Sequence, residues 1–241
     1  MCHNDKLGAL PAPGTYQRKE AEGLKYWEFD SQIEGRDPGA ANKRVMILTD
    51  IYGCNAFYQS FATYLTSKGW QAHLIDLFSD LGELKEVTRE AAFERRHLLR
   101  DRRVCDMLEA HVKSQEISAV VGFCLGGNYV LELARRNVPV NLVGYYPFPA
   151  GLPNEDGIEI PLDYLAQVTK PVTLLLGDSD DSAGRENTAK AAKLAQSNKA
   201  LDAHVYHKSG HGFLAHLDSD DDTLRKNAED SLAVCLQVIS Q

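Results

Sequence analysis

Short runs of apolar residues recur along the chain, and longer amphipathic or polar segments separate them. Several runs lack strict alternation, which is typical of strands covered on both faces. They lie at residues 45–48, 72–77, 118–123, 140–146, 172–176 and 202–206. Helix-compatible segments fall between them, at about residues 56–68, 87–113, 126–136, 184–198 and 223–239. This alternation predicts an α/β fold with a mostly parallel twisted sheet and helices on both faces.

The N-terminal part of the chain departs from this pattern. Residues 24–34 predict an additional edge strand, whereas residues 1–20 predict an irregular segment. Glycine and proline punctuate predicted loops at 37–43 and 147–161. With 241 residues, 44% of them hydrophobic, the chain can bury one large core, so we expect a single domain over residues 1–241.

Composition narrows the function classes. The 34 acidic residues against 26 basic ones give a net charge of −8, which would repel a nucleic-acid backbone or an anionic membrane surface. No apolar stretch approaches the length of a membrane span, and the N-terminus does not resemble a signal peptide, so we expect a soluble cytoplasmic protein. The five cysteines include no C-x-x-C pair, and the odd count favours unbridged thiols over a disulfide framework or a structural zinc site.

The most informative motif follows the third apolar run. Residues 122–127 read Gly-Phe-Cys-Leu-Gly-Gly, and a helix-compatible segment comes next. This is the pattern of a nucleophile elbow, in which a strained turn holds the nucleophile and the residues two positions away must be small. Cys124 takes the nucleophile position between Gly122 and Gly126. The start of a helix at this point favours a thiolate and offers backbone N–H groups to an oxyanion.

Two later loops carry candidates for the acid and the base. Asp178, Asp180 and Asp181 follow the fifth apolar run, and His211, flanked by glycines, follows the sixth. Loops after the carboxyl ends of parallel strands meet at one edge of the sheet, where a carboxylate could orient the imidazole that takes the thiol proton. The spacing alone does not choose among the three aspartates.

These motifs together resemble the dienelactone hydrolase family, the cysteine-dependent branch of the α/β-hydrolase fold. The resemblance extends from about residue 24 to the C-terminus. It rests on TDIYGCNAF at 49–57, the aspartate of LIDLF at 74–78, GFCLGG at 122–127, GYY at 144–146, GDSD at 177–180 and GHGF at 210–213.

The resemblance implies specific roles. Cys124 is then the nucleophile, His211 the base and Asp180 the acid, and the backbone N–H groups of Leu125 and Ile51 form the oxyanion hole. It implies no cofactor and no metal.

The resemblance also implies residues around this centre. Asp50 falls where the family places a carboxylate that helps to ionise the thiol, although the alternative is a turn residue that caps its loop. Arg89 falls where the family binds a substrate carboxylate, and Phe93 and Tyr145 are further expected substrate contacts. The chain departs from the family's namesake at Ala215, where the namesake has a second carboxylate-binding arginine, and this puts the dienelactone substrate in question.

Two other clusters carry less weight. The aspartates at 218–222 lack the glycine and the distal glutamate of a calcium-binding loop, so we expect a solvated loop. His207 and His211 are four residues apart, but the intervening Gly210 and the strand context argue against a helical metal site.

The sequence therefore predicts a cysteine hydrolase that cleaves a small ester or lactone, including substrates that bear a carboxylate, through an acyl-enzyme. The alternatives are a thioesterase or a biosynthetic isomerase or cyclase on the same fold, or a non-catalytic binding protein. We expect no nucleic-acid or membrane partner, and a monomer or a homodimer.

Overall fold

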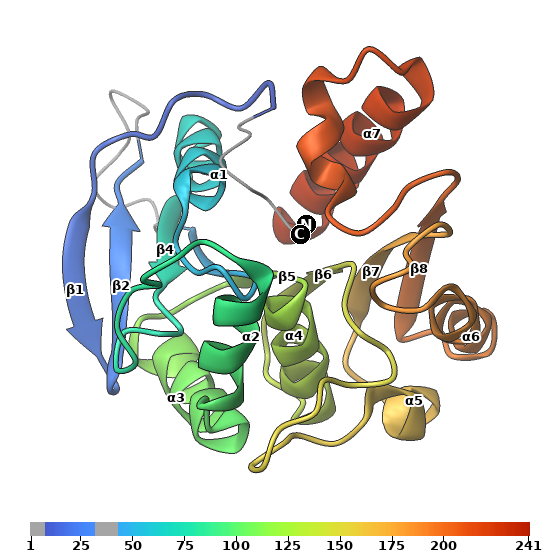
Figure 1. Ribbon diagram of the computed structural model, residues 1–241, viewed down its shortest axis with the longest axis horizontal. Helices are drawn as coiled ribbons and strands as arrows, with labels where there is room; N and C mark the ends of the chain where they lie inside the picture. Colours follow the sequence, from blue (N-terminus) through green and yellow to red (C-terminus); the bar gives the residue numbers. More distant parts are fainter. Residues whose placement is uncertain (1–7, 32–42) are drawn as a thin grey trace.

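One eight-stranded sheet runs through the described part of the chain. The computed structural model describes residues 8–31 and 43–241 (Figure 1). The strand order is β1-β2-β4-β3-β5-β6-β7-β8; β2 is antiparallel to both neighbours, and the strands from β4 to β8 in this order are parallel. The strands are β1 (Gln17–Ala21), β2 (Leu24–Phe29), β3 (Arg44–Leu48), β4 (Gln71–Ile75), β5 (Ala119–Phe123), β6 (Asn141–Tyr145), β7 (Val172–Gly177) and β8 (Leu201–Tyr206). The predicted α/β class with a mostly parallel sheet is confirmed.

Helices cover both faces of the sheet, as Figure 1 shows. Alternate side chains of β3 point to opposite faces, so Val45 and Ile47 pack with α1 and α7, while Met46 and Leu48 pack with α3 and α4. Two apolar cores result. The helices are α1 (Ala56–Ser67), α2 (Arg89–His97), α3 (Asp101–Ser114), α4 (Leu125–Arg135), α5 (Pro161–Tyr164), α6 (Arg185–Ser197) and α7 (Asp222–Ile239), with short 3-10 helices η1 (Leu165–Gln167) and η2 (Phe213–Asp218).

The N-terminal segment is more regular than its sequence suggests. Residues 1–20 were expected to be irregular, but strand β1 begins at Gln17 and forms a hairpin with β2. Glu22 and Gly23 occupy the turn with φ values of 54° and 76°. Positive φ at both central residues matches the twist of the two strands in a two-residue hairpin. Here a Glu-Gly pair adopts it in place of the more usual Asn-Gly or Asp-Gly.

Strand β2 is shorter than predicted, and the prediction that it forms the edge of the sheet is wrong, because β1 pairs with its outer side. Strand β2 ends at Phe29, although residues 24–34 were expected to form it. Residues 32–34 and most of the predicted loop at 37–43 lie outside the described residues. The bounds of the other predicted strands, and of the helices apart from the one at 87–113, differ from the observed ones by two residues or fewer.

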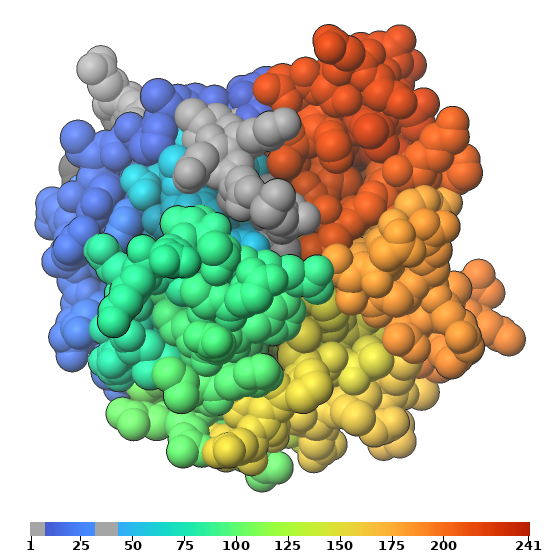
Figure 2. Space-filling model, in the orientation of Figure 1, coloured from blue at the N-terminus to red at the C-terminus, as the bar shows by residue number. Residues whose placement is uncertain are grey.

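The predicted helix at 87–113 is two helices. The hydroxyl of Thr88 caps α2 by accepting the N–H of Ala91 at 3.2 Å, so the first helix begins at residue 89. The carbonyl of Leu99, beyond its end, accepts the side-chain amide of Asn154 at 2.9 Å. A contact from residues 147–160 thus satisfies the backbone between α2 and α3, and the two segments adjoin at the surface (Figure 2).

The carboxyl ends of the parallel strands bring together loops that are far apart in the sequence. Cys124 follows β5, Asp180 follows β7 and His211 follows β8, and these strands belong to the run β5-β6-β7-β8 of one sheet. Over residues 8–31 and 43–241, no helix combines the length and apolar character that crossing a bilayer requires.

Candidate active site

Cys124 stands on a sharp turn between β5 and α4. Its φ of 55° and ψ of −113° are a strained combination for a residue with a side chain. The turn is tight because a Cβ on Gly122 would lie 2.1 Å from the Gly126 carbonyl oxygen, and one on Gly126 would lie 2.3 Å from the Leu48 carbonyl oxygen. The two glycines are therefore required for the close approach of the strand and the helix. The predicted elbow geometry is present.

The start of α4 lies at the Cys124 side chain. Cys124 is only 2% exposed, yet it lines a pocket that opens at this edge of the sheet. Leu125 is the first residue of α4, so its N–H has no carbonyl one turn earlier within the helix to which it could donate. The positive end of the helix dipole and this N–H therefore lie beside the sulfur, where they favour negative charge.

His211 is paired with Asp180. The Nδ1 atom of His211 lies 2.8 Å from Oδ2 of Asp180, and their side chains are 5% and 1% exposed. The other two aspartates of the loop have different partners: Asp178 contacts His207 at 2.7 Å and Asp181 contacts Arg185 at 2.7 Å. Of the three aspartates, Asp180 is the one that contacts the His211 imidazole at the pocket.

Two aromatic rings lie next to the imidazole. The rings of Tyr146 and Phe148 each lie 5.1 Å from that of His211, centroid to centroid. Asn128, one turn into α4, fixes the backbone of Phe148: its amide donates to the Phe148 carbonyl and its oxygen accepts the Phe148 N–H, both at 2.8 Å. The helix that follows Cys124 thus also places a wall of the pocket.

The loop after β3 forms the opposite side of the site. The Asp50 carbonyl accepts the N–H of Gly53 at 3.3 Å, and the buried Asp50 carboxylate accepts the N–H of Tyr52 at 2.8 Å. Asp50 therefore caps its own turn, which is one of the two roles expected from the sequence. Ile51 lies in the middle of this turn and lines the pocket.

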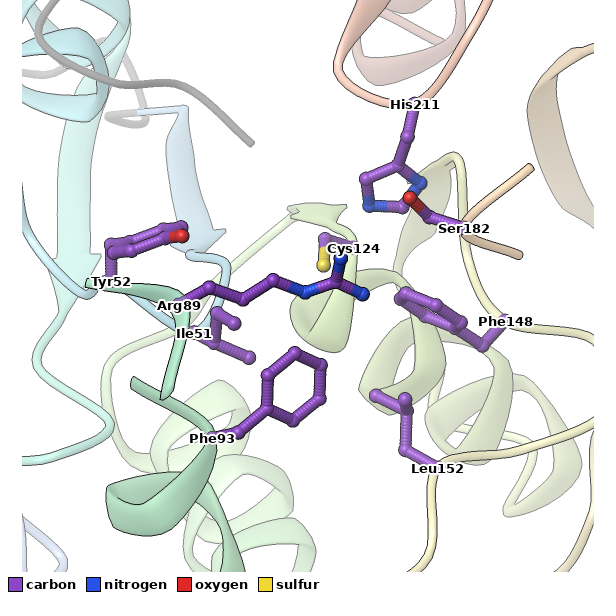
Figure 3. A pocket seen from close by; sticks show the side chains of 9 residues that line it. All are labelled: Ile51, Tyr52, Arg89, Phe93, Cys124, Phe148, Leu152, Ser182 and His211. Carbon is purple, nitrogen blue, oxygen red and sulfur yellow. The ribbon is translucent and has the colours of Figure 1, made fainter. Parts of the chain in front are cut away.

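The pocket between these loops encloses about 480 Å³ including its open mouth, and its lining is mainly apolar (Figure 3). Helix α2 contributes Arg89 and Phe93, and the Arg89 guanidinium lies 5.3 Å from the centre of the Phe93 ring. Figure 3 shows the Arg89 side chain extending across the pocket toward Cys124. The residues that line it are Ile51, Tyr52, Arg89, Phe93, Cys124, Phe148, Leu152, Ser182 and His211.

Tyr145 is not among the residues that line this pocket, contrary to the expectation of a substrate contact. It is the last residue of β6, its side chain is buried, and its hydroxyl donates to the Ser231 carbonyl of α7 at 2.9 Å. Strand alternation directs it into the core, whereas Tyr146, one residue later, contacts His211. Tyr145 is therefore a packing residue.

The sequence interpretation missed several pocket residues. Tyr52 lies within the TDIYGCNAF motif, while Phe148, Leu152 and Ser182 belong to loops whose course depends on distant contacts. The aromatic residue in the Pro-Phe-Pro sequence at 147–149 was the one local signal for the Phe148 wall.

A mostly parallel sheet with an elbow turn after β5, a carboxylate after β7 and a histidine after β8 defines the class of α/β hydrolases. Within this class the chain belongs to the dienelactone hydrolase family, whose model matches residues 34–241. Membership of this family makes it a hydrolase of esters or lactones, and the resemblance inferred from the sequence is confirmed.

Known relatives support this assignment. The chain is 43% identical over 224 residues to carboxymethylenebutenolidase 2 of Cupriavidus pinatubonensis, covering 92% of this chain and 91% of the relative. It is 31% identical over 238 residues to a carboxymethylenebutenolidase of Rhodococcus opacus, covering 96% and 93%. Among solved structures, a putative dienelactone hydrolase from Klebsiella pneumoniae shares the fold with a TM-score of 0.77 at 18% identity, covering 97% of this chain and 99% of that one.

Proposed function

We propose that this chain hydrolyses a small lactone or ester through Cys124 as nucleophile, His211 as base and Asp180 as the acid that orients the base. The observation that carries the proposal is the 2.8 Å contact between His211 and Asp180, with His211 and Cys124 lining the same pocket. A thiol on a strained elbow beside an oriented imidazole is the arrangement that nucleophilic acyl transfer needs.

The reaction proceeds in two stages. His211 takes the thiol proton, the sulfur bonds to the substrate carbonyl carbon, and the N–H groups of Leu125 and Ile51 stabilise the oxyanion. When the tetrahedral intermediate collapses, the C–O bond to the leaving oxygen breaks and His211 returns the proton to that oxygen. Water then attacks the thioester with His211 as base, the C–S bond breaks, His211 returns the proton to the sulfur of Cys124, and the acid product leaves.

Asp50 has a second role in this proposal. Its carboxylate is buried in the turn that carries Ile51, next to the proposed oxyanion hole. When substrate is bound, the carboxylate assists His211 as a proton acceptor for the Cys124 thiol, and its contact with the Tyr52 N–H keeps the carboxylate in place.

The substrate that fits best is small, partly flat and bears a carboxylate. Phe93, Phe148 and Leu152 supply apolar walls, and Arg89 supplies a guanidinium at the mouth of the pocket. The names of the two curated relatives denote enzymes acting on carboxymethylenebutenolide. With Ala215 in place of a second arginine, the carboxylate is bound by Arg89 alone, so we propose a broader range of esters and lactones.

We also propose that the protein works in the reducing environment of the cytoplasm. The four cysteines that the structure describes form no disulfide, and a cysteine nucleophile must stay reduced to act. That the enzyme is a monomer or a homodimer stays a prediction from the sequence.

The test compares Cys124→Ala with Cys54→Ala, since Cys54 is a partly buried thiol that does not line the pocket. Both variants are assayed against lactones, aryl esters and acyl thioesters, and the acyl-enzyme is sought by intact mass. We expect loss of hydrolysis and of acylation in Cys124→Ala alone. Full hydrolysis of activated esters by Cys124→Ala would refute the proposal, and a preference for acyl thioesters would replace the lactone with a thioester substrate.

A further inference from the structure

Arg95 contacts the proposed oxyanion loop from behind. Its Nη2 donates to the carbonyl of Ile51 at 3.0 Å, and its Nη1 donates to the carbonyl of Gly82 at 3.1 Å. In the described part of the chain, Arg95 is not among the residues that line the Cys124 pocket; it lines the neighbouring cleft together with Tyr52 and Gly53. The guanidinium therefore acts on the loop without occupying the space of the substrate.

The contact falls on the peptide group at the centre of the turn. Arg95 binds the carbonyl of the peptide between Ile51 and Tyr52, and the Asp50 carboxylate accepts the N–H of the same peptide at 2.8 Å. Gly53 closes the turn with its N–H to the Asp50 carbonyl, at a φ of 81°. A turn whose central peptide is bound at both its oxygen and its nitrogen has few alternative conformations, so the Ile51 N–H is held in one direction.

Arg95 is itself held in place. Its guanidinium lies 4.0 Å from the centre of the Phe78 ring, a short cation–π contact. Burial lowers the pKa of Arg95, while the carboxylates of Asp76 and Asp50 oppose this and keep the charged form favoured. The Arg95 side chain is partly desolvated, stacked on Phe78 and bound to two carbonyls. It therefore loses little conformational freedom when an oxyanion forms at the loop.

We propose that Arg95 is a positioning residue for the oxyanion hole, fixing the Ile51 N–H through the Ile51 carbonyl. The inference rests on the proposed function, since it assumes that an oxyanion forms at Cys124. Arg95 shares helix α2 with Arg89 and Phe93 of the pocket. One helix thus binds the substrate and aligns the loop that stabilises the transition state, so that a shift of α2 affects both.

The experiment separates oxyanion stabilisation from thiol reactivity. Acylation of Cys124 by p-nitrophenyl acetate passes through an oxyanion, whereas alkylation by iodoacetamide is a displacement at a saturated carbon and forms none. We expect Arg95→Met to slow acylation by about 10- to 100-fold, less than the loss of an oxyanion donor itself, with KM changed little. Alkylation of Cys124 should keep its wild-type rate.

Three further variants sharpen the comparison. Arg103→Met removes an exposed arginine from the adjacent helix α3 and should leave both rates unchanged. Arg95→Lys keeps the charge but has one nitrogen for two carbonyls, so its acylation rate should lie between those of Arg95→Met and the wild type. It also provides the measurement if Arg95→Met does not fold. In Arg95→Ala, added ethylguanidine should restore part of the acylation rate.

The outcomes are distinct. Equal losses in acylation and alkylation, or wild-type acylation in both Arg95→Met and Arg95→Lys, would overturn the role of Arg95 and leave the proposed function standing. Absence of any acylation at Cys124 in the wild-type protein would instead overturn the proposed function.

Discussion

The carboxylate of Asp180 is engaged through both of its oxygens, with Oδ2 2.8 Å from Nδ1 of His211 and Oδ1 accepting the N–H of Ala183 at 2.9 Å. The second contact fixes the carboxylate within its own loop, so its direction toward His211 does not depend on the imidazole. A carboxylate oriented in this way selects the His211 tautomer with the proton on Nδ1, which leaves Nε2 able to accept a proton.

Replacing Asp180 by asparagine should remove the preference for the His211 tautomer that carries its proton on Nδ1. The amide can donate to Nδ1 and favour the tautomer that carries the proton on Nε2, which cannot act as a base. We expect kcat in Asp180→Asn to fall by about 10²- to 10⁴-fold with the fold intact. Asp178→Asn, which alters the exposed pair with His207, is the control and should stay near the wild type. Equal activity of the two variants would contradict the assignment of the acid.

Packing at the elbow makes a prediction about stability. A methyl group on Gly122 would lie 2.1 Å from a backbone oxygen that cannot move away without shifting α4. Gly122→Ala should therefore reduce the free energy of unfolding by at least about 1–3 kcal/mol. In the control Gly144→Ala, the added methyl meets Leu174 at 3.5 Å, an ordinary contact, so the loss should be much smaller. Urea unfolding of both variants gives the comparison, and similar losses would show that the close approach is not what requires the glycine.

The pocket makes a prediction about substrate recognition. Arg89→Gln should raise KM for esters that bear a carboxylate and change KM for neutral esters little, because it removes a charge-assisted contact worth about 1.5–3 kcal/mol, or roughly 10- to 100-fold. Arg103→Gln removes one positive charge outside the pocket and controls for the change in net charge. If both classes of ester lose affinity equally, Arg89 shapes the pocket and does not recognise a carboxylate.

Two buried histidines make the stability of the fold dependent on pH. Nδ1 of His73 on β4 lies 3.1 Å from Nε2 of His111 on α3, and the Tyr26 ring stacks on His73 at 4.6 Å. Burial lowers the pKa of His73 to about 3 and that of His111 to about 4, and for His73 the neighbouring His111 adds to the effect. Both rings are therefore neutral in the folded protein at neutral pH.

The sign of the effect follows from proton uptake. Below about pH 6.5 the unfolded chain binds protons at both histidines while the folded protein does not, so stability falls as the pH decreases toward the folded pKa values. Each histidine contributes a slope of up to about 1.4 kcal/mol per pH unit in this window. His111→Gln should reduce the slope by up to that amount, measured by urea unfolding between about pH 6.5 and 4.5. An unchanged slope would show that His111 is protonated in the folded protein.

The sequence alone determined the features that depend on local pattern. The alternation of apolar runs and amphipathic segments specifies the α/β class, because strand and helix periodicities are properties of neighbouring residues. The elbow at Cys124 was also predictable, since Gly122 and Gly126 stand at fixed spacing from the nucleophile and a following helix is visible in the sequence.

Only the tertiary structure decided which side chains meet. Asp178, Asp180 and Asp181 lie within four consecutive positions, yet they have three different partners. Asp178 and Asp180 meet His207 and His211 because the loop after β7 folds against the segment after β8, whereas Asp181 meets Arg185 at the start of α6. The contact of Arg95 with the loop after β3 also joins segments that are far apart in the sequence. The packing of a helix or a loop against a distant segment is set by non-local contacts, which no local spacing encodes.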